Sequence, residues 1–534
     1  MDISAIQKRV DSLFSGWNND NTPGMAVAIV KDGSVIHMQG YGMANLENGT
    51  PITACSVFDS GSLSKMLTGF AIAMLVQDKK VSLDDDIRKF IGELPDLGKV
   101  ITIRNLLHHT SGLRCWSAFV NWLGDMETIG DVIRIIKRQK ALNFNPGDEF
   151  LYCNTGYVLL ARVIENATGQ PFAEWTKDNI FSPLGMTNTY FCTDHNALTM
   201  NATNGYTGNG GGGYKKRMMR TPAGSSALFT TVEDLSKWLL NMDNGAVGGE
   251  SVLRITREKG SLNNGKEVQY GFGLFVGQYK GVNIIEHGGE CGGYRSAVSF
   301  SPDKRFGIAL LSNTDTVDAW QLVRKLYDIC LFDESGIEVQ GDNINKPKIA
   351  AVSSEIYDSY LGDYLIEPGH AVSIIKENHR LYWHITGQPR FELLPVSETE
   401  FIDKDGDPVT FHRNQNGICN EVTLVWAWGK NVTATRIASL DLSHMKGIEG
   451  KYYSEEADTV YAIAVDEGKL VASNARHEDI VLTACSDTQF AGDPWWFRQV
   501  DFIRDENGYV LAFELTNMGQ ARNLRFNRMA QQKL

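Results

Sequence analysis

The sequence predicts an α+β protein in which a domain of helices and antiparallel strands is followed by two all-β antiparallel barrels. From residue 1 to about 335, helical and strand patterns are mixed, whereas only strand patterns follow. The strand-rich part contains an internal repeat, which indicates two copies of one module. We therefore expect three domains, at residues 1–335, 345–440 and 441–534.

In the first domain, short apolar runs between turn residues predict the strands. Residues 25–42 form an expected hairpin, and residues 270–289 and 293–313 contain three or more further antiparallel strands. Residues 60–260 are mostly helical in pattern, and residues 319–332 predict another helix. Helices that flank an antiparallel sheet, together with a helical subdomain, give an α+β domain large enough for catalysis.

Three short motifs of the strand-rich part occur twice in the same order, roughly 90 residues apart. Strands this short, with turns this frequent, are typical of small closed barrels. The first copy contains Gly362-x-Tyr364, Ser397-x-Thr399-x-Phe401 and Phe411-x-Arg413, and the second contains Gly450-x-Tyr452, Ser486-x-Thr488-x-Phe490 and Phe502-x-Arg504.

Composition excludes several classes of function. A chain of 534 residues is too long to fold around a single hydrophobic core, so several domains are expected. The net charge of −13 disfavours nucleic acids and anionic membranes as partners, because phosphate binding needs a basic face. The amphipathic N-terminus lacks the features of a secretion signal, and no apolar run reaches 18 residues, so we expect a cytoplasmic protein without a membrane span.

The cysteines do not indicate a metal site or a disulfide framework. They are dispersed and form no C-x-x-C motif, and no H-E-x-x-H motif occurs either. We expect reduced thiols, no metal and no cofactor. The eight cysteines stand at positions 55, 115, 153, 192, 291, 330, 419 and 485.

The motif Ser62-x-x-Lys65 opens an apolar helical run, which places a hydroxyl and an amine on one face at the start of a helix. Ser-x-x-Lys is a weak pattern that occurs three more times, at Ser301, Ser373 and Ser443, always outside a helical context. Catalysis therefore needs partners elsewhere in the chain.

Two further segments offer such partners. Tyr152 and Asn154 precede an apolar helix, where the alternative is a capping Asn with a packed Tyr. His287 ends a predicted strand and is followed by Gly288 and Gly289, which let a backbone N–H group approach a ligand closely. A lone His at such a place is more often structural.

In this order and spacing, the three elements resemble the active-site motifs of the serine β-lactamase and penicillin-binding-protein superfamily. The segments "LLHHTSGL" (106–113), "SPLGMTNTYF" (182–191) and "YGFGL" (270–274) add to the resemblance. A Lys-Thr-Gly third element is usual in that superfamily. The His-Gly-Gly found here, the two β-modules and the segment "SGLRCWSAF" (111–119) are similar to those of the bacterial D-aminopeptidases.

The resemblance implies a β-lactamase/transpeptidase-like catalytic domain that works through an acyl-enzyme on Ser62. It implies that Lys65 and Tyr152 transfer the proton, and that Asn154 binds the substrate amide and Lys65. His287 stands in the place of the third-element lysine as a mostly neutral group. The backbone N–H groups of Ser62 and Glu290 are the expected oxyanion hole.

The resemblance also implies further contacts to the substrate, from the third element, the helical subdomain and a loop of the last barrel, "SNARHED" (473–479). In the D-aminopeptidases a loop of this module helps to bind the free amine of the substrate. Besides Asn154, the expected substrate-binding residues are Gly288, Gly289, Glu290, Trp116, Phe275, Glu478 and Asp479.

Four functions are compatible with these residues. The first is a D-aminopeptidase or D-amino acid amidase, and the second is a carboxylesterase with the same machinery. The third is a β-lactamase or D,D-carboxypeptidase, which the missing third-element lysine disfavours. The fourth is a non-catalytic binding module, which the complete set of motifs disfavours. The expected partner is a small peptide, amide or ester, and a homodimer is possible.

Overall fold

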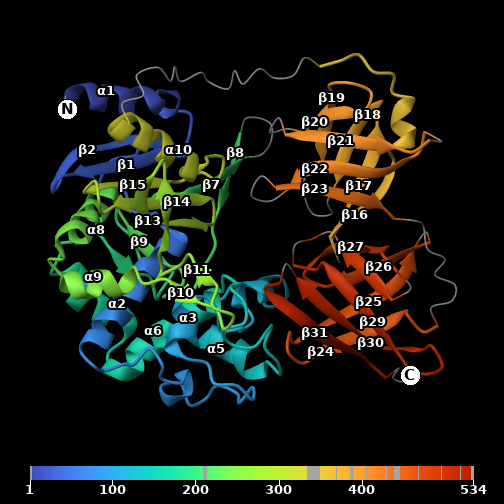
Figure 1. The fold of residues 1–534 in the computed structure, drawn as a ribbon, viewed down its shortest axis with the longest axis horizontal. Coiled ribbons are helices and arrows are strands. Elements are labelled where there is room, and N and C mark those ends of the chain that lie inside the picture. Colours follow the sequence, from blue (N-terminus) through green and yellow to red (C-terminus); the bar gives the residue numbers. More distant parts are fainter. Residues whose placement is uncertain are drawn as a thin grey trace. The chain divides into compact units, whose positions relative to one another are not determined.

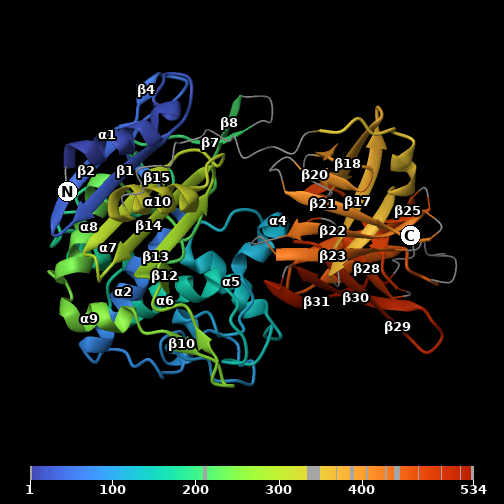
Figure 2. The ribbon, with the colours of Figure 1, turned by 45° about the horizontal axis from the view of Figure 1, so that its top comes forward.

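We describe the chain from a computed structural model (Figures 1 and 2). The structure describes residues 3–530 with gaps at 209–212, 333–348, 368–369, 385–389, 404–406, 416, 427–429, 438–445, 467, 487, 493, 495 and 518. It forms two compact units. The first comprises Met1–Ser117 and Asp125–Val339, and the second comprises Ala118–Gly124 and Gln340–Leu534.

A six-stranded antiparallel sheet forms the centre of the first unit, in the order β12-β13-β14-β15-β1-β2. This arrangement confirms the predicted α+β class, and the expected hairpin at 25–42 is β1–β2. The strands are β1 (Met25–Lys31), β2 (Ser34–Tyr41), β12 (Phe275–Tyr279), β13 (Val282–Cys291), β14 (Tyr294–Ser301) and β15 (Phe306–Ser312).

Helices cover both faces of this sheet because β1 is apolar on both sides. Met25, Val27 and Ile29 share one core with α1 (Ile3–Leu13) and α10 (Ala319–Tyr327), which overlie the sheet in Figure 2. Since side chains alternate along a strand, the small residues between them face the other side, where α8 (Val232–Asn244) packs.

The helical subdomain surrounds α2 (Ser64–Gln77), the helix that follows Ser62. Eleven residues of α2 are buried, so it is apolar on nearly all sides, as its sequence predicts. The other helices of this unit are α3 (Ile103–Leu107), α5 (Ile129–Arg138), α6 (Asn154–Thr168), α7 (Phe172–Thr176) and α9 (Gly249–Thr256). Its short strands are β3 (Met43–Asn45), β4 (Thr50–Pro51), β5 (Phe58–Asp59), β6 (Tyr190–Phe191), β7 (Gly205–Gly208), β8 (Tyr214–Arg217), β9 (Leu228–Thr230), β10 (Gly260–Ser261) and β11 (Glu267–Val268).

Two closed eight-stranded antiparallel barrels follow, shown in orange and red in Figure 1, and they confirm the predicted all-β modules. The first contains β16 (Gly362–Glu367), β17 (His370–Glu377), β18 (Arg380–His384), β19 (Phe391–Pro395), β20 (Glu400–Ile402), β21 (Pro408–Arg413), β22 (Cys419–Trp426) and β23 (Lys430–Arg436). The second contains β24 (Gly450–Ser454), β25 (Thr459–Asp466), β26 (Lys469–Asn474), β27 (His477–Ala484), β28 (Gln489–Gly492), β29 (Gln499–Arg504), β30 (Val510–Asn517) and β31 (Ala521–Arg528). The predicted boundaries at 335, 345 and 440 lie outside the described residues.

Equivalent hydrogen bonds in the two barrels explain the sequence repeat. The Tyr364 hydroxyl donates to the carbonyl four residues before it at 2.8 Å, and the Tyr452 hydroxyl does the same at 2.7 Å. The backbone N–H of Phe411 donates to Thr399 O, and that of Phe502 donates to Thr488 O. The repeated residues therefore tie the same strands together in each barrel.

One short segment of the catalytic half belongs to the barrel unit. Ala118–Gly124, which contains α4 (Val120–Leu123), lies within the second compact unit. The indole of Trp122 is buried there, and its Nε1–H donates to the Tyr461 hydroxyl at 2.8 Å. The predicted domain at 1–335 wrongly includes residues 118–124, because nothing in their local sequence indicates that they pack with the barrels.

Within the described ranges, no helix is long and apolar enough to cross a bilayer. All eight cysteines are free thiols. Among the residues that the structure describes, no group of three His, Cys, Asp or Glu side chains is arranged to hold a metal ion.

Candidate active site

Ser62 lies where β5 leads into α2. The strand ends at Asp59, a 3₁₀ turn spans Gly61–Leu63, and α2 continues from Ser64. Ser62 is half-buried, at the N-terminal end of the helix, where the dipole favours negative charge. The turn therefore presents the hydroxyl at the edge of a buried helix.

Lys65 forms a hydrogen bond with the Ser62 hydroxyl. Its Nζ lies 3.0 Å from Ser62 Oγ and donates to the Ser225 carbonyl at 2.7 Å. The Lys65 side chain is 0% exposed, and this burial lowers its pKa to about 7, against a weaker opposing effect of the thiols of Cys115 and Cys153. A neutral amine keeps a lone pair that can accept the proton of Ser62.

Tyr152 approaches the same hydroxyl from the loop before α6. Its ring centroid lies 4.9 Å from Lys65 Nζ, and the nearby Ser62 hydroxyl lowers the pKa of the phenol, against the larger effect of burial. Burial raises the pKa of Tyr152 above its usual value, so the phenol stays protonated near neutral pH. The structure thus brings together the three residues that the sequence predicts for proton transfer.

Asn154 is the first residue of α6, and its Oδ1 is buried without a hydrogen-bond partner among the described residues. The expected bond between Asn154 and Lys65 is not formed among the described residues, where the Lys65 amine bonds to Ser62 Oγ and the Ser225 carbonyl. An unpaired buried acceptor is costly, which is consistent with a site for a substrate N–H group.

Trp116 lies against the start of α6. Its backbone N–H donates to the Thr155 hydroxyl at 2.8 Å, and its side chain is only 2% exposed. Its Nε1 has no partner among the described residues. The predicted contact of Trp116 with substrate remains a prediction.

His287 has both ring nitrogens occupied by the protein. Nδ1 lies 2.6 Å from Gly288 O, and Nε2 lies 2.9 Å from the Tyr270 hydroxyl. Because a carbonyl only accepts, Nδ1 carries the hydrogen and Nε2 accepts from Tyr270. Burial, with a smaller effect of Lys65, lowers the pKa of His287 to about 3. His287 is thus a neutral ring held in one tautomer, and its catalytic role remains a prediction.

The glycines after His287 make room for protein atoms, and their predicted contact with substrate remains a prediction. A Cβ on Gly289 would lie 2.0 Å from Ser60 O and 2.9 Å from Ser62 N. A Cβ on Gly288 would lie 2.7 Å from the Trp320 ring. Gly289 therefore allows β13 to lie directly against the turn that contains Ser62.

Glu290 and Phe275 are the exposed members of the predicted binding set near the third element. The Glu290 side chain is 73% exposed and lies 3.5 Å from Arg295 Nη2. Phe275 is 36% exposed, and its ring centroid lies 5.3 Å from that of His287. Both residues are on strands of the central sheet, β13 and β12.

Glu478 and Asp479 lie at the start of β27 in the second barrel, where both are exposed. They belong to the other compact unit than Ser62. Their assignment to the substrate site remains a prediction.

Sequence reasoning missed several groups that surround Lys65 and His287. Tyr270 and His109 lie in the quoted segments "YGFGL" and "LLHHTSGL" but received no role. The ring of His109 lies 4.4 Å from that of Tyr152, centroid to centroid. Ser225 acts through its carbonyl, which every residue type carries, so its sequence gives no signal.

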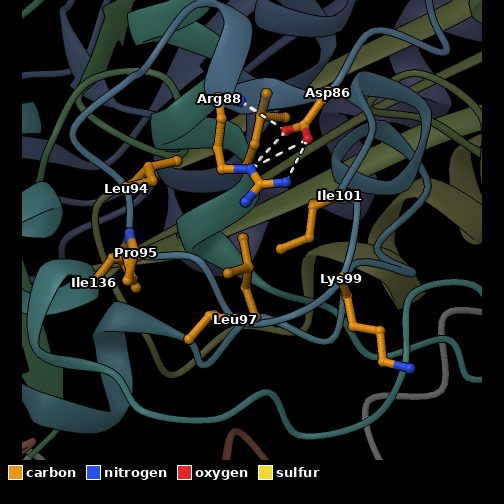
Figure 3. Close-up of a pocket in the computed structure, with 10 residues that line it drawn as sticks. Asp86, Arg88, Leu94, Pro95, Leu97, Lys99, Ile101 and Ile136 are labelled. Carbon is orange, nitrogen blue, oxygen red and sulfur yellow. Dashed lines mark hydrogen bonds and ion pairs between the residues drawn. The ribbon is translucent and has the colours of Figure 1, made fainter.

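An apolar pocket elsewhere in this unit is shown in Figure 3. Leu94, Leu97 and Ile101 line it, and an ion pair of 2.8 Å joins Arg88 to Asp86 beside them. Ser62, Lys65 and Tyr152 do not line this pocket, so it is separate from the candidate active site.

Comparison with known proteins agrees with this geometry. The family model described as beta-lactamase matches residues 5–326, which is more than half of the chain. The chain belongs to the beta-lactamase family. It is thus a serine hydrolase of the penicillin-recognising superfamily, with two β-barrels added to the catalytic domain.

The chain is similar to a penicillin-binding protein, a D-aminopeptidase and a D-amino acid amidase. It is 28% identical to penicillin-binding protein 4* of Bacillus subtilis, over 74% of this chain and 91% of that protein. It is 25% identical to the D-aminopeptidase of Brucella anthropi, over 88% and 85%. The structure of D-amino acid amidase from Ochrobactrum anthropi SV3 has a similar fold, with a TM-score of 0.52 and 23% identity over 62% of this chain and 98% of that one.

Proposed function

We propose that this protein is a D-aminopeptidase or D-amino acid amidase that releases N-terminal D-residues from short peptides and amides. The observation that carries the proposal is a neutral His287, whose two ring nitrogens are both hydrogen-bonded to the protein, in the same site as Ser62, Lys65 and Tyr152. The similarity to the Brucella anthropi D-aminopeptidase over most of both chains supports the same substrate class.

In the proposed reaction, Ser62 Oγ attacks the substrate carbonyl while its proton passes to Lys65 Nζ. The proton then moves through Lys65 and Tyr152 to the leaving amine, and an acyl-enzyme on Ser62 remains. Water hydrolyses the ester bond and restores the free serine. The N–H groups of Ser62 and Glu290 stabilise the oxyanion, at about 3 kcal/mol for each donor.

Charge around the site supports a substrate with a free amine. A permanently charged lysine in the third element would attract a substrate carboxylate, and His287 stays uncharged instead. The net charge of −13 favours a cation. The exposed Glu290 carboxylate adds negative charge at the site, where Arg295 partly balances it. These features disfavour penicillins and substrates with a C-terminal carboxylate.

A panel of four chromogenic substrates tests the proposal: D-alanine p-nitroanilide, L-alanine p-nitroanilide, p-nitrophenyl acetate and nitrocefin. We expect a higher kcat/KM for the D-anilide than for the L-anilide, and slow cleavage or no cleavage of nitrocefin. Cleavage of nitrocefin with the highest kcat/KM of the panel would show that the proposal is wrong.

A carboxylesterase is the second candidate. The partly exposed ring of Phe275 beside His287 offers an apolar contact that suits an acyl chain. An esterase would cleave p-nitrophenyl acetate and longer acyl esters while leaving both anilides intact. The same panel therefore separates the two functions.

A further inference from the structure

Asp59 is a buried carboxylate that the proposed reaction does not use. It ends β5, directly before the turn that contains Ser62, and its residue is only 5% exposed. No Lys or Arg forms an ion pair with it in the part of the chain that the structure describes. A buried carboxylate is costly unless hydrogen bonds compensate, so its partners are informative.

The partners of Asp59 lie on the two backbone segments that carry the expected oxyanion donors. The N–H of Gly61 donates to Asp59 Oδ1 at 3.0 Å, one residue before Ser62. The thiol of Cys291, one residue after Glu290, lies beside the Asp59 carboxylate, and burial together with this carboxylate raises the pKa of the thiol. One side chain therefore lies beside the neighbours of both donors.

The two segments lie in direct contact. Gly61 has a φ of +53°, and a Cβ on it would lie 2.9 Å from Glu290 N. Ser296 adds a second connection, because its hydroxyl donates to Ser60 O at 2.7 Å. With this contact, a small displacement of either segment changes the distance between the N–H groups of Ser62 and Glu290.

We propose that Asp59 is a positioning residue that sets the spacing of the oxyanion hole, by holding the Gly61 N–H where Gly61 packs against Glu290, next to the Cys291 thiol. This inference rests on the proposed acyl-enzyme at Ser62. Oxyanion donors act in the transition state more than on the bound substrate. Loss of Asp59 should therefore lower kcat and leave KM nearly unchanged.

The test compares Asp59→Ala, Asp59→Asn, Cys291→Ala and Cys291→Ser in the full chain, with p-nitrophenyl acetate and its thionoester analogue as substrates. We expect Asp59→Ala to lower kcat about 100-fold and Asp59→Asn about tenfold, with KM within threefold of wild type. Cys291→Ala should lose about tenfold, and Cys291→Ser should recover most of that loss, because a hydroxyl can donate to the carboxylate.

The thionoester reports on the hole itself. Sulfur accepts hydrogen bonds more weakly than oxygen, so the wild type should prefer the oxygen ester, and this preference should shrink in Asp59→Ala. Asp234→Asn is the matched control, since Asp234 is buried in the same unit but accepts from Thr189 and Lys237. It should lower the unfolding temperature without changing kcat or the oxygen preference.

A folded Asp59→Ala enzyme with the wild-type kcat and oxygen preference refutes the positioning role. If Asp59→Ala does not fold, a Cys291→Ala enzyme with the kcat of the wild type also refutes the positioning role. A wild-type protein that is never acylated at Ser62 refutes the proposed function, and this inference with it.

Discussion

Lys65 combines two properties at the residue scale that oppose each other: complete burial and an ionisable amine. Burial lowers its pKa to about 7, so a substantial fraction of the enzyme carries a neutral amine at neutral pH. That neutral form is the one that can accept the proton of Ser62, 3.0 Å away. The burial that gives Lys65 its neutral form therefore also lowers the free energy of unfolding of the protein.

Ser62→Ala should abolish hydrolysis of every substrate, with a loss of at least 1000-fold, because no acyl-enzyme can form. The change removes one half-buried oxygen, so we expect the unfolding temperature to stay within about 2 °C. Mass spectrometry after treatment with a slowly hydrolysed ester should place the acyl group on the peptide that contains Ser62. A label on another peptide would contradict the assignment.

Activity should rise with pH as Lys65 loses its proton. The amine is protonated below its pKa and neutral above it, so kcat/KM should increase through about pH 7 and then level off. Lys65→Arg should be nearly inactive across this range, because a guanidinium stays protonated. An active Arg variant with a flat pH profile would show that Lys65 does not act as a base.

Lys65→Met should be inactive but more stable than the wild type, by roughly 1–3 kcal/mol at pH 7. The amine has a pKa of about 7 when folded and 10.5 when unfolded, so the unfolded chain binds the proton more tightly. Wild-type stability should therefore rise between pH 7 and pH 10, and the advantage of Met should shrink. Urea unfolding at these two pH values measures both effects, and an equal difference at both would contradict the burial argument.

At the scale of elements, the site is a junction between β13 and the turn before α2. Its glycines are required because backbone meets backbone there: Ser60 O would be 2.0 Å from a Cβ on Gly289. The same sheet contains Gly277 in β12, where a Cβ would meet nothing within 4 Å. Gly289 and Gly277 therefore allow the same substitution to be compared at a crowded and at an open position of one sheet.

Gly289→Ala should lower kcat at least 100-fold, because the new Cβ must push β13 away from the Ser62 turn. Gly277→Ala should change kcat less than twofold. Steady-state kinetics of the two variants measures this difference, and a nearly wild-type Gly289→Ala would show that the junction tolerates separation.

Much of this could be predicted from sequence, for reasons that differ between elements. The apolar run after Ser62 predicts a buried helix, and the paired motifs around Tyr364 and Tyr452 predict two equal barrels, since both signals are local or repeated. Asp59 carries no such signal. Its role depends on Cys291, a contact over more than 200 residues that no local pattern encodes.

His287 shows the limit of a motif. Its position predicts a place in the site, but its protonation depends on Tyr270 and Gly288, which occupy both ring nitrogens. The residue type leaves open whether a histidine exchanges protons or is held in one tautomer. Only the surrounding hydrogen bonds decide between these roles.

On the scale of the whole molecule, the chain crosses between its two units more than once. Residues 118–124 leave the catalytic unit, and Trp122 becomes a buried part of the barrel unit, with ring centroids 6.2 Å from Phe526 and 6.5 Å from Trp496. The protein therefore cannot be cut into independent domains at a single linker.

Trp122→Ala should destabilise the barrel unit by about 3–5 kcal/mol, as for other buried aromatic side chains. Trp122→Phe keeps a ring but loses the donor to Tyr461, so its cost should be nearer 1 kcal/mol. Denaturant unfolding followed by far-ultraviolet circular dichroism compares the two. Equal, small losses would show that Trp122 is not part of the packed unit.

The Trp122 contact also has a consequence for synthesis on the ribosome. Its partner Tyr461 is 339 residues further along the chain. At typical elongation rates, roughly 20–70 s pass between the appearance of these two residues. During that interval the nascent chain carries Trp122 without the barrel residues that bury it in the folded protein. Burial of Trp122 therefore waits for the last module to be translated, and a ribosome that stops early releases a chain with this apolar side chain exposed.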